Sequence, residues 1–477
     1  MHKKRDVINS FKWSALERII SQAMQLCIIL FLARILGPEA FGIVALMMVF
    51  ISIGQVFVDG GILVSLVRQE SCSEDDYSTA FYFNVGVGFF AFLMLVCIAH
   101  PVAKFYNDSK VSYMLMTLGL SLIFNSLSIV QKARLTKTLD FKAQAKASIC
   151  SVFLSGILSI ILAFNNYGAW ALVYQYVLMS FLNTSMLYFF SPWLPKGNFA
   201  KDSFKQLFGF SYKLLISGLI DSCYKNIYPV IIGKYFSSAQ VGFFNQARQL
   251  SSIPAMTLTL IIQRVTFPVL SKVQKNHEEL DSNYLLMLKI ATATIFPVML
   301  GISLVSDSLI WVILGKEWQE SISYLAILSF AFAFYPIHAI NLNLIHVKGR
   351  SDLFLKLELV KKSAATVILL LSLNFGLIGI CISLLIMSLF ELFANTYVTQ
   401  KLSSITMWRQ CKELGIICLL ALVSASFSYF IFNSMAPSIF KIACSLTTAL
   451  FLYIILLFYI KPDVFNFFRK NIIITRG

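Results

Sequence analysis

The side chains most able to do chemistry in this chain are polar and charged residues inside otherwise apolar segments. They recur mostly at intervals of three or four positions, so each set occupies one face of a helix. We call these sets polar stripes. They are Arg18, Gln22 and Gln25 in segment 11–35; Asp221, Lys225 and Tyr228 in segment 212–234; and Asn245, Arg248 and Gln249 in segment 240–263.

Each polar stripe contains one basic residue, Arg18, Lys225 or Arg248. A charge inside a membrane span costs roughly 2.5–3.5 kcal/mol on insertion scales, so such a residue is a functional hypothesis by default. Three stripes turned toward one another would line a water-filled, cationic cavity. A cavity of that kind suits an anionic ligand.

Acidic residues near these bases allow two interpretations. Asp221 lies four residues before Lys225 and could simply neutralise it. Glu17 and Arg18 lie near the end of their segment and could extend to the membrane surface. In the functional interpretation, Glu17, Asp59 and Asp221 bind a coupling ion or balance the charge of the bases.

Three more ionisable side chains occupy apolar segments. Glu391 is the lone acid of segment 377–400, and no role is inferred for it. His338 and His346 lie close to Pro336 and could titrate. A single histidine in such a segment is more often part of a hydrogen-bonded scaffold, and this is how we interpret both.

The elements that carry these residues must be membrane helices. The 477 residues are 58% hydrophobic and only 13% charged, and the mean hydropathy is +0.77. Soluble domains carry about 25% charged residues. Backbone groups in lipid must be satisfied within the segment, which favours helices over open strands.

An all-α membrane protein of about fourteen transmembrane helices is therefore predicted. The turn signal at Asn374–Gly376 separates two of them, and twelve helices remain an alternative count. The expected limits are 11–35, 41–66, 79–99, 112–131, 146–164, 168–190, 212–234, 240–263, 286–312, 321–345, 358–375, 377–400, 412–433 and 438–461.

Basic residues concentrate in alternate loops, which predicts the orientation. Segments 132–146 and 348–362 are rich in Lys and Arg, whereas the intervening loops carry few. Cytoplasmic loops keep this excess, so both termini are expected in the cytoplasm. The net charge of +16 then needs no nucleic acid to explain it. The outer loops are too short for a catalytic domain.

Motifs for enzymatic chemistry are not found. The chain has no G-x-x-x-x-G-K-[ST] phosphate loop, no G-x-S-x-G and no H-E-x-x-H. Its nine cysteines are scattered without a CxxC pair, which argues against a zinc site and a disulfide framework. We expect no cofactor, no metal and no enzyme activity.

An internal repeat is indicated by a shift of 200 positions. The shift aligns Arg34 with Lys234 and Gly42 with Gly242. Many transporters consist of two repeats with the substrate between them. The expected parts are an N-lobe at 1–195, a C-lobe at 205–402, two further helices within 410–461 and a cytoplasmic tail at 462–477.

Four stretches resemble the polysaccharide-export flippases of the Wzx and WzxC type. The superfamily of these flippases also holds the lipid II flippase and the multidrug and toxin extrusion proteins. The stretches are Arg34-Ile-Leu-Gly-Pro-Glu-Ala-Phe-Gly42, Val241-Gly-Phe-Phe-Asn-Gln-Ala-Arg248 through Pro254, Val265-Thr-Phe-Pro268 through Lys272, and the basic loop from Lys132 to Phe141.

This resemblance implies a V-shaped bundle around a central cavity. Its implied activity is the movement of undecaprenyl-pyrophosphate-linked oligosaccharides from the inner to the outer leaflet of the bacterial inner membrane. The pyrophosphate would be held by Arg18, Lys225 and Arg248, with Arg34 and Lys234 as weaker candidates. Gln22, Gln25, Tyr228, Asn245 and Gln249 would line the cavity.

The resemblance also implies the partners and an energy source. The partners are the lipid-linked oligosaccharide, membrane lipid, a polysaccharide polymerase and a chain-length regulator. Moving two negative charges outward gains roughly 4.6 kcal/mol per 100 mV, at about 2.3 per charge. The alternative is an exporter of small amphipathic cations, but three bases in the cavity favour an anionic cargo.

Overall fold

The computed structural model describes residues 4–467, except for the side chains of 4–12, 14, 15 and 18. In the described part every regular element is a helix, so the prediction of an all-α protein is confirmed. The chain divides into two compact units, Met1–Gly242 and Phe243–Gly477.

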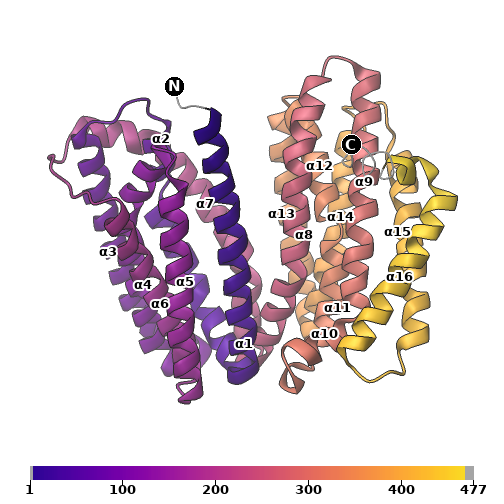
Figure 1. The fold of residues 1–477 in the computed structure, drawn as a ribbon, viewed down its shortest axis with the longest axis horizontal. Coiled ribbons are helices and arrows are strands. Elements are labelled where there is room, and N and C mark those ends of the chain that lie inside the picture. The colour runs from indigo at the N-terminus through magenta and orange to yellow at the C-terminus, as the bar shows by residue number, and fades with distance from the viewer. Residues whose placement is uncertain (1–3, 468–477) are drawn as a thin grey trace. The chain divides into compact units, whose positions relative to one another are not determined.

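The first unit contains seven α-helices and the start of an eighth. These are α1 (Lys4–Asp59), α2 (Ile62–Arg68), α3 (Glu74–Tyr106), α4 (Lys110–Lys137), α5 (Phe141–Phe164), α6 (Ala169–Phe190), α7 (Lys201–Tyr235) and the beginning of α8 (Ser238–Lys272). α3 packs on α4, α4 and α5 pack on α6, and α7 packs on α1, α2 and α3. Figure 1 shows these helices running alongside one another.

The second unit contains the rest of α8 and eight further α-helices. These are α9 (His277–Leu304), α10 (Ser306–Ile313), α11 (Ser321–Phe332), α12 (Tyr335–Val347), α13 (Ser351–Ser372), α14 (Gly376–Thr399), α15 (Met407–Phe432) and α16 (Ile439–Ile460). Two short 3₁₀ turns, η1 (Lys316–Trp318) and η2 (Leu373–Phe375), precede α11 and α14. α9 contacts α11, α12, α15 and α16.

Ten segments of the described chain are long and apolar enough to cross a membrane. Two of them, Ile19–Arg68 and Ser351–Thr399, have 50 and 49 residues and exceed the roughly 20 residues that one span needs. α6 and α7 lie outside these ten, with 22 and 35 residues. The protein is therefore a multi-pass membrane protein, and each predicted range lies on helix.

Glycines at positive φ explain where the long segments break. Gly37 has φ 71° inside α1, and Pro38 begins the next helical stretch there. Gly376 has φ 69° and begins α14, which confirms the predicted turn at Asn374–Gly376. Gly60 and Gly61 have φ 41° and 76° and end α1, so the single helix predicted over 41–66 is interrupted.

Two other predicted spans are also interrupted. The range 286–312 is divided at Val305 between α9 and α10. The range 321–345 is divided at Ala333 and Phe334 between α11 and α12. Pro336 lies in the first turn of α12, where its missing N–H leaves no intrahelical hydrogen bond unmade.

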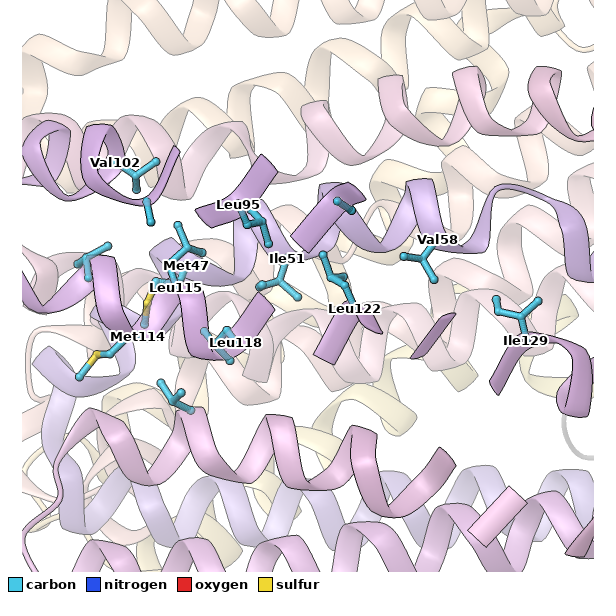
Figure 2. Packing of buried hydrophobic residues seen from close by; sticks show 14 of the residues in the cluster. Met47, Ile51, Val58, Leu95, Val102, Met114, Leu115, Leu118, Leu122 and Ile129 are labelled. Atoms are coloured by element: carbon cyan, nitrogen blue, oxygen red, sulfur yellow. The ribbon is translucent and has the colours of Figure 1, made fainter. Parts of the chain in front are cut away.

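The core of the first unit is an apolar cluster shared by α1, α3 and α4. Met47 and Ile51 of α1 meet Leu115 and Leu118 of α4, and all four are fully buried. Figure 2 shows these side chains directed toward one another between the helices. Outside this core, large apolar side chains such as Phe90 (63% exposed) are available to lipid.

The two halves of the predicted repeat meet at a close backbone contact in the first unit. A Cβ added at Gly42 would lie 1.7 Å from the Ser238 carbonyl oxygen. A Cβ added at Gly242 would lie 2.0 Å from the Pro38 carbonyl oxygen. Positions 38 and 42 thus contact positions 238 and 242 reciprocally, as a local two-fold axis requires. The offset of 200 agrees with that of the sequence repeat.

Candidate functional site

A polar cavity of about 350 Å³ lies inside the first unit, among α1, α4, α5 and α6. Amides and hydroxyls dominate its wall, together with one lysine and one glutamate. Its lining is Glu17, Ser21, Gln25, Asn125, Lys132, Gln144, Ser148, Ser151, Val152, Tyr176, Met179, Ser180, Asn183 and Leu187.

Helical spacing brings these side chains together. Asn125 and Lys132 lie seven residues apart on α4, and Gln144 and Ser148 lie four apart on α5. Residues at these intervals share one face of an α-helix. Each of these helices turns a polar face inward and leaves apolar side chains for lipid.

A hydrogen-bonded chain joins the cavity to Asp59 at the end of α1. The Asn125 side-chain amide donates to Gln55 Oε1 over 2.8 Å. Gln55 Nε2 in turn donates to Asp59 Oδ1 over 2.9 Å. Asp59 acts electrostatically on both Lys132 and Tyr176 of the cavity wall. The acid therefore balances the cavity's lysine from a distance.

Among the side chains that the structure describes, Lys132 is the cation of this cavity. Its side chain is half-buried, and no carboxylate of the described residues lies within 4 Å of its ammonium group. A compact ammonium group with three donors can bind a carboxylate, a phosphate or several sugar hydroxyls. The surrounding amides and hydroxyls can donate and accept hydrogen bonds with the same ligand.

Several predicted site residues lie at or near this cavity. Glu17 and Gln25 line it directly, and Asp59 is linked to it through Gln55. Gln22 is exposed and is not among the lining residues. The side chain of Arg18 lies outside the described residues, so its predicted role stays a prediction.

The polar stripe of α7 contains a formed ion pair. Lys225 Nζ lies 2.6 Å from Asp221 Oδ2, and both side chains are largely exposed. The alternative in which Asp221 neutralises Lys225 is thus present in the structure. Tyr228, one turn further on, is buried.

The two weaker candidates lie near the repeat contact. Arg34 is exposed at the end of the first stretch of α1. Lys234 donates a hydrogen bond to the Phe105 carbonyl oxygen over 3.3 Å. Its ammonium group also lies 4.1 Å from the centre of the Phe105 ring. Lys234 therefore anchors the end of α7 to the end of α3.

The polar stripe of α8 belongs to the second unit. Asn245, Arg248 and Gln249 are all half-buried there. The other predicted bases belong to the first unit. Convergence of Arg18, Lys225 and Arg248 on one anion therefore stays a prediction.

Lys132 is the residue that sequence analysis missed as a site. Arg134 and Lys137 follow it closely in the chain, so it was counted with the basic residues of the predicted cytoplasmic loop. The usable signal was the alignment of Asn125 with Lys132 on α4, together with polar faces at similar intervals on 141–164 and 169–190. These segments are apolar on average, so their few short polar side chains were overlooked in the sequence.

A second cavity, of about 670 Å³, lies among α9, α15 and α16 in the second unit. Pro297, Ala425, Leu446 and Leu450 are among its mostly apolar lining residues. Such a wall cannot compensate a charged ligand but suits a hydrocarbon chain. In the described part of the chain, no group of three or more His, Cys, Asp or Glu side chains could hold a metal ion.

The arrangement of helices is similar to that of known membrane transporters. The lipid II flippase MurJ in an inward closed conformation matches with a TM-score of 0.75 and 14% identity, over 94% of this chain and 99% of that chain. An inward-facing multidrug resistance MATE family transporter of the MOP superfamily matches with a TM-score of 0.58 and 13% identity, over 80% and 98%. The chain is a multi-pass membrane protein with this transporter fold.

Sequence similarity then gives the family. The polysaccharide biosynthesis protein family matches residues 31–323, more than half of the chain. The chain belongs to this family, which confirms the resemblance inferred from its motifs.

Similar proteins of the family occur in several bacteria. The lipopolysaccharide biosynthesis protein WzxC of Escherichia coli (strain K12) is 23% identical over 76% of this chain and 74% of its own length. The succinoglycan biosynthesis transport protein ExoT of Rhizobium meliloti (strain 1021) is 23% identical over 68% and 66%. The teichuronic acid biosynthesis protein TuaB of Bacillus subtilis (strain 168) is 25% identical over 63% and 62%.

Proposed function

We propose that the protein is a flippase that moves lipid-linked oligosaccharides across the bacterial inner membrane for cell-surface polysaccharide synthesis. The cargo is an undecaprenyl-pyrophosphate-linked repeat unit of O-antigen, capsule or exopolysaccharide. It travels from the cytoplasmic to the periplasmic leaflet by alternating access, and both termini face the cytoplasm. A polymerase and a chain-length regulator use the exported unit.

The observation that carries this proposal is the polar cavity that contains Lys132. Such a cavity is unexpected in a protein that is surrounded by lipid, and this protein belongs to the polysaccharide biosynthesis family. Its walls on α4 and α5 come from helix parts near the predicted cytoplasmic side, and those on α1 and α6 extend toward the middle of the span. Lys132 lies five residues before the end of α4, and Gln144 lies three after the start of α5. A cavity of about 350 Å³ accommodates a sugar ring. The cavity therefore receives a sugar of the cargo from the cytoplasmic leaflet.

The charged and lipid parts of the cargo need different surroundings. A pyrophosphate with about two negative charges cannot enter hydrocarbon without compensation. Arg18, Lys225 and Arg248 supply that compensation, and Asp221 releases Lys225 when the anion arrives. The apolar cavity among α9, α15 and α16 suits the polyprenyl chain.

An energy source follows from the same charges. An inside-negative potential favours outward movement of an anion by roughly 2.3 kcal/mol per charge per 100 mV. An ion on Asp59, Asp221 or Glu17 supplies the remaining drive. Relatives named for polysaccharide synthesis and transport support this cargo over the small amphipathic cations of the extrusion proteins.

Complementation of a bacterium that lacks its own oligosaccharide flippase tests the function. Surface polysaccharide is measured for wild type and for Lys132→Met, Arg18→Ala, Lys225→Ala and Arg248→Ala at equal expression. A hydrogen bond to a charged group contributes roughly 1.5–3 kcal/mol, so loss of Lys132 should reduce export about tenfold or more. Lys205→Met, an exposed base on α7, is the matched control.

The cavity itself is tested by an isosteric change that removes its hydrogen bonds. Asn183→Leu should reduce export, whereas Ser185→Leu on the exposed face of the same helix should not. Failure of wild type to restore any of several polysaccharides would refute the flippase function. Restoration by wild type and by every cavity variant would refute the cavity while the function stands.

A further inference from the structure

α12, α13 and α14 bring a buried group of ionisable side chains together in the second unit. His338 of α12 and Lys361 of α13 are each only 6% exposed. Glu391 of α14 lies beside them, with its Oε2 3.6 Å from His338 Nε2. In the sequence Glu391 is the lone acid of its segment and His338 is interpreted as scaffold, whereas the structure places the two side by side.

The hydrogen bonds around His338 determine its protonation state. The Ser388 hydroxyl donates to the Ala331 carbonyl oxygen over 2.9 Å, so its oxygen accepts from His338 Nε2 at 3.3 Å. The Asn395 amide donates to His338 Nδ1 over 3.3 Å. The ring is therefore neutral with its proton on Nε2, and both nitrogens are occupied. His338 therefore acts as a positioning residue. Because both of its ring nitrogens are hydrogen-bonded, a further proton would bind to another side chain.

Glu391 is the side chain in this group that can bind a further proton. No donor among the described residues lies within hydrogen-bonding distance of its carboxylate. The nearby Lys361 forms an ion pair with Glu358 one turn before it on α13. Lys361 and Glu358 act on Glu391 with opposite signs, and the effect of Lys361 is the larger of the two.

One more cation belongs to this region. Arg248 of α8 and Glu391 both act electrostatically on Tyr335, at the start of α12. The ring of Tyr335 lies 6.5 Å from that of His338 and is 38% exposed. Arg248 and Glu391 thus share Tyr335 as a neighbour, whereas the charged groups that act on Glu391 itself are Lys361 and Glu358.

Glu391 is also the more accessible of the two acid–base groups. Its side chain is 28% exposed, whereas that of His338 is 8% exposed. It lies 15 residues after the start of α14, well inside a predicted span. An ionised carboxylate at this depth is costly without a partner, and protonation removes that cost.

We propose that Glu391 is a proton-binding site of this protein, positioned by His338, Ser388 and Asn395. The role of the bound proton in driving transport rests on the proposed function, but its binding does not. Protonation converts the carboxylate to a neutral acid and so removes the cost of a charge at this depth. This site is separate from Asp59, Asp221 and Glu17.

Infrared spectroscopy of the purified full-length protein in lipid tests proton binding without any cargo. Difference spectra between about pH 4 and pH 9 span the range from free to deeply buried glutamates. Wild type should show the carbonyl band of a protonated buried carboxyl, and Glu391→Gln should lose that band. Glu358→Gln is the matched control and should keep it, because Glu358 is paired with Lys361.

Two further variants separate proton binding from loss of fold. Glu391→Asp should keep the band at a shifted frequency, and His338→Asn should keep it with a shifted midpoint. A band that persists in Glu391→Gln, or that wild type lacks over the whole pH range, would overturn the proposal. Complementation by Glu391→Gln is measured in parallel, so failure of wild type there counts against the flippase function alone.

Discussion

Tyr284 of α9 is a fully buried side chain whose hydroxyl links three helices of the second unit. The hydroxyl lies 2.8 Å from Asn341 Oδ1 on α12 and 3.1 Å from Gln410 Oε1 on α15. Inside an apolar bundle these carbonyl oxygens have few other donors. Loss of the hydroxyl should therefore cost the penalty of unsatisfied buried groups, about 1–3 kcal/mol.

Tyr284→Phe should accordingly lower the free energy of unfolding by about 1–3 kcal/mol in detergent, measured by denaturant titration. The control is Tyr459→Phe, which changes a side chain that is 76% exposed. Equal stability of Tyr284→Phe and wild type would mean that this hydroxyl does not hold the three helices together.

Single residues also show what the sequence could and could not predict. Charges inside apolar segments were easy to find, and the α7 pair Asp221–Lys225 formed as its spacing allowed. Lys132 was missed because a lysine near the end of a span looks like a loop residue. The partnership of Glu391 with His338 was missed because it joins positions 53 residues apart through the packing of α12 on α14.

Helix positions were predictable from apolarity, but helix breaks were only partly so. A break near Pro38 was expected because glycine and proline stand between two apolar segments. The break at Val305 is followed by Ser306, Asp307 and Ser308, and the break at Phe334 is followed two residues later by Pro336. Mean apolarity over a span is the same for one long helix and two shorter ones, so the predicted ranges ran through these local signals.

The close contact between α1 and the start of α8, at Gly42 and Gly242, gives a prediction about how helices pack. In Gly42→Ala, the new methyl group would meet the Ser238 carbonyl oxygen, and backbone must move to admit it. Overpacking of this kind typically costs about 1–3 kcal/mol. We expect less folded protein and a lower melting temperature by size-exclusion chromatography of heated samples, and Gly242→Ala should behave alike.

Gly86→Ala is the matched control for this contact. Gly86 lies inside α3 with no atom within 4 Å of an added Cβ. Alanine is favoured over glycine in a helix by about 1 kcal/mol, so this variant should be as stable as wild type or more stable. Tolerance of alanine at both 42 and 242 would show that α1 and α8 do not approach so closely.

For the whole molecule, the family, the all-α fold and the multi-pass character followed from composition and motifs. They did so because insertion into a membrane imposes long apolar helices on any sequence. The lobes expected at 1–195 and 205–402 stay a prediction, whereas contacts divide the chain after Gly242. In that division α7 packs with α1, α2 and α3. Such packing between distant segments leaves no local signal in the sequence.

Orientation in the membrane is the property on which the direction of transport depends. Cytoplasmic loops retain Lys and Arg, so Gln274, between Lys272 and Lys275, should face the cytoplasm. Gln319, in the short segment between α10 and α11, should face the periplasm. Both side chains are exposed and of one type, which makes them a matched pair of reporters.

Each glutamine is replaced by cysteine in a chain whose nine native cysteines are changed to serine or alanine. A membrane-impermeant thiol reagent should label Gln319→Cys in spheroplasts, and Gln274→Cys only after lysis. The opposite pattern would place the basic loops outside. The ends of α4 and α5 that line the polar cavity would then lie on the periplasmic side, and the proposed loading of the cargo from the cytoplasmic leaflet would fail with the orientation.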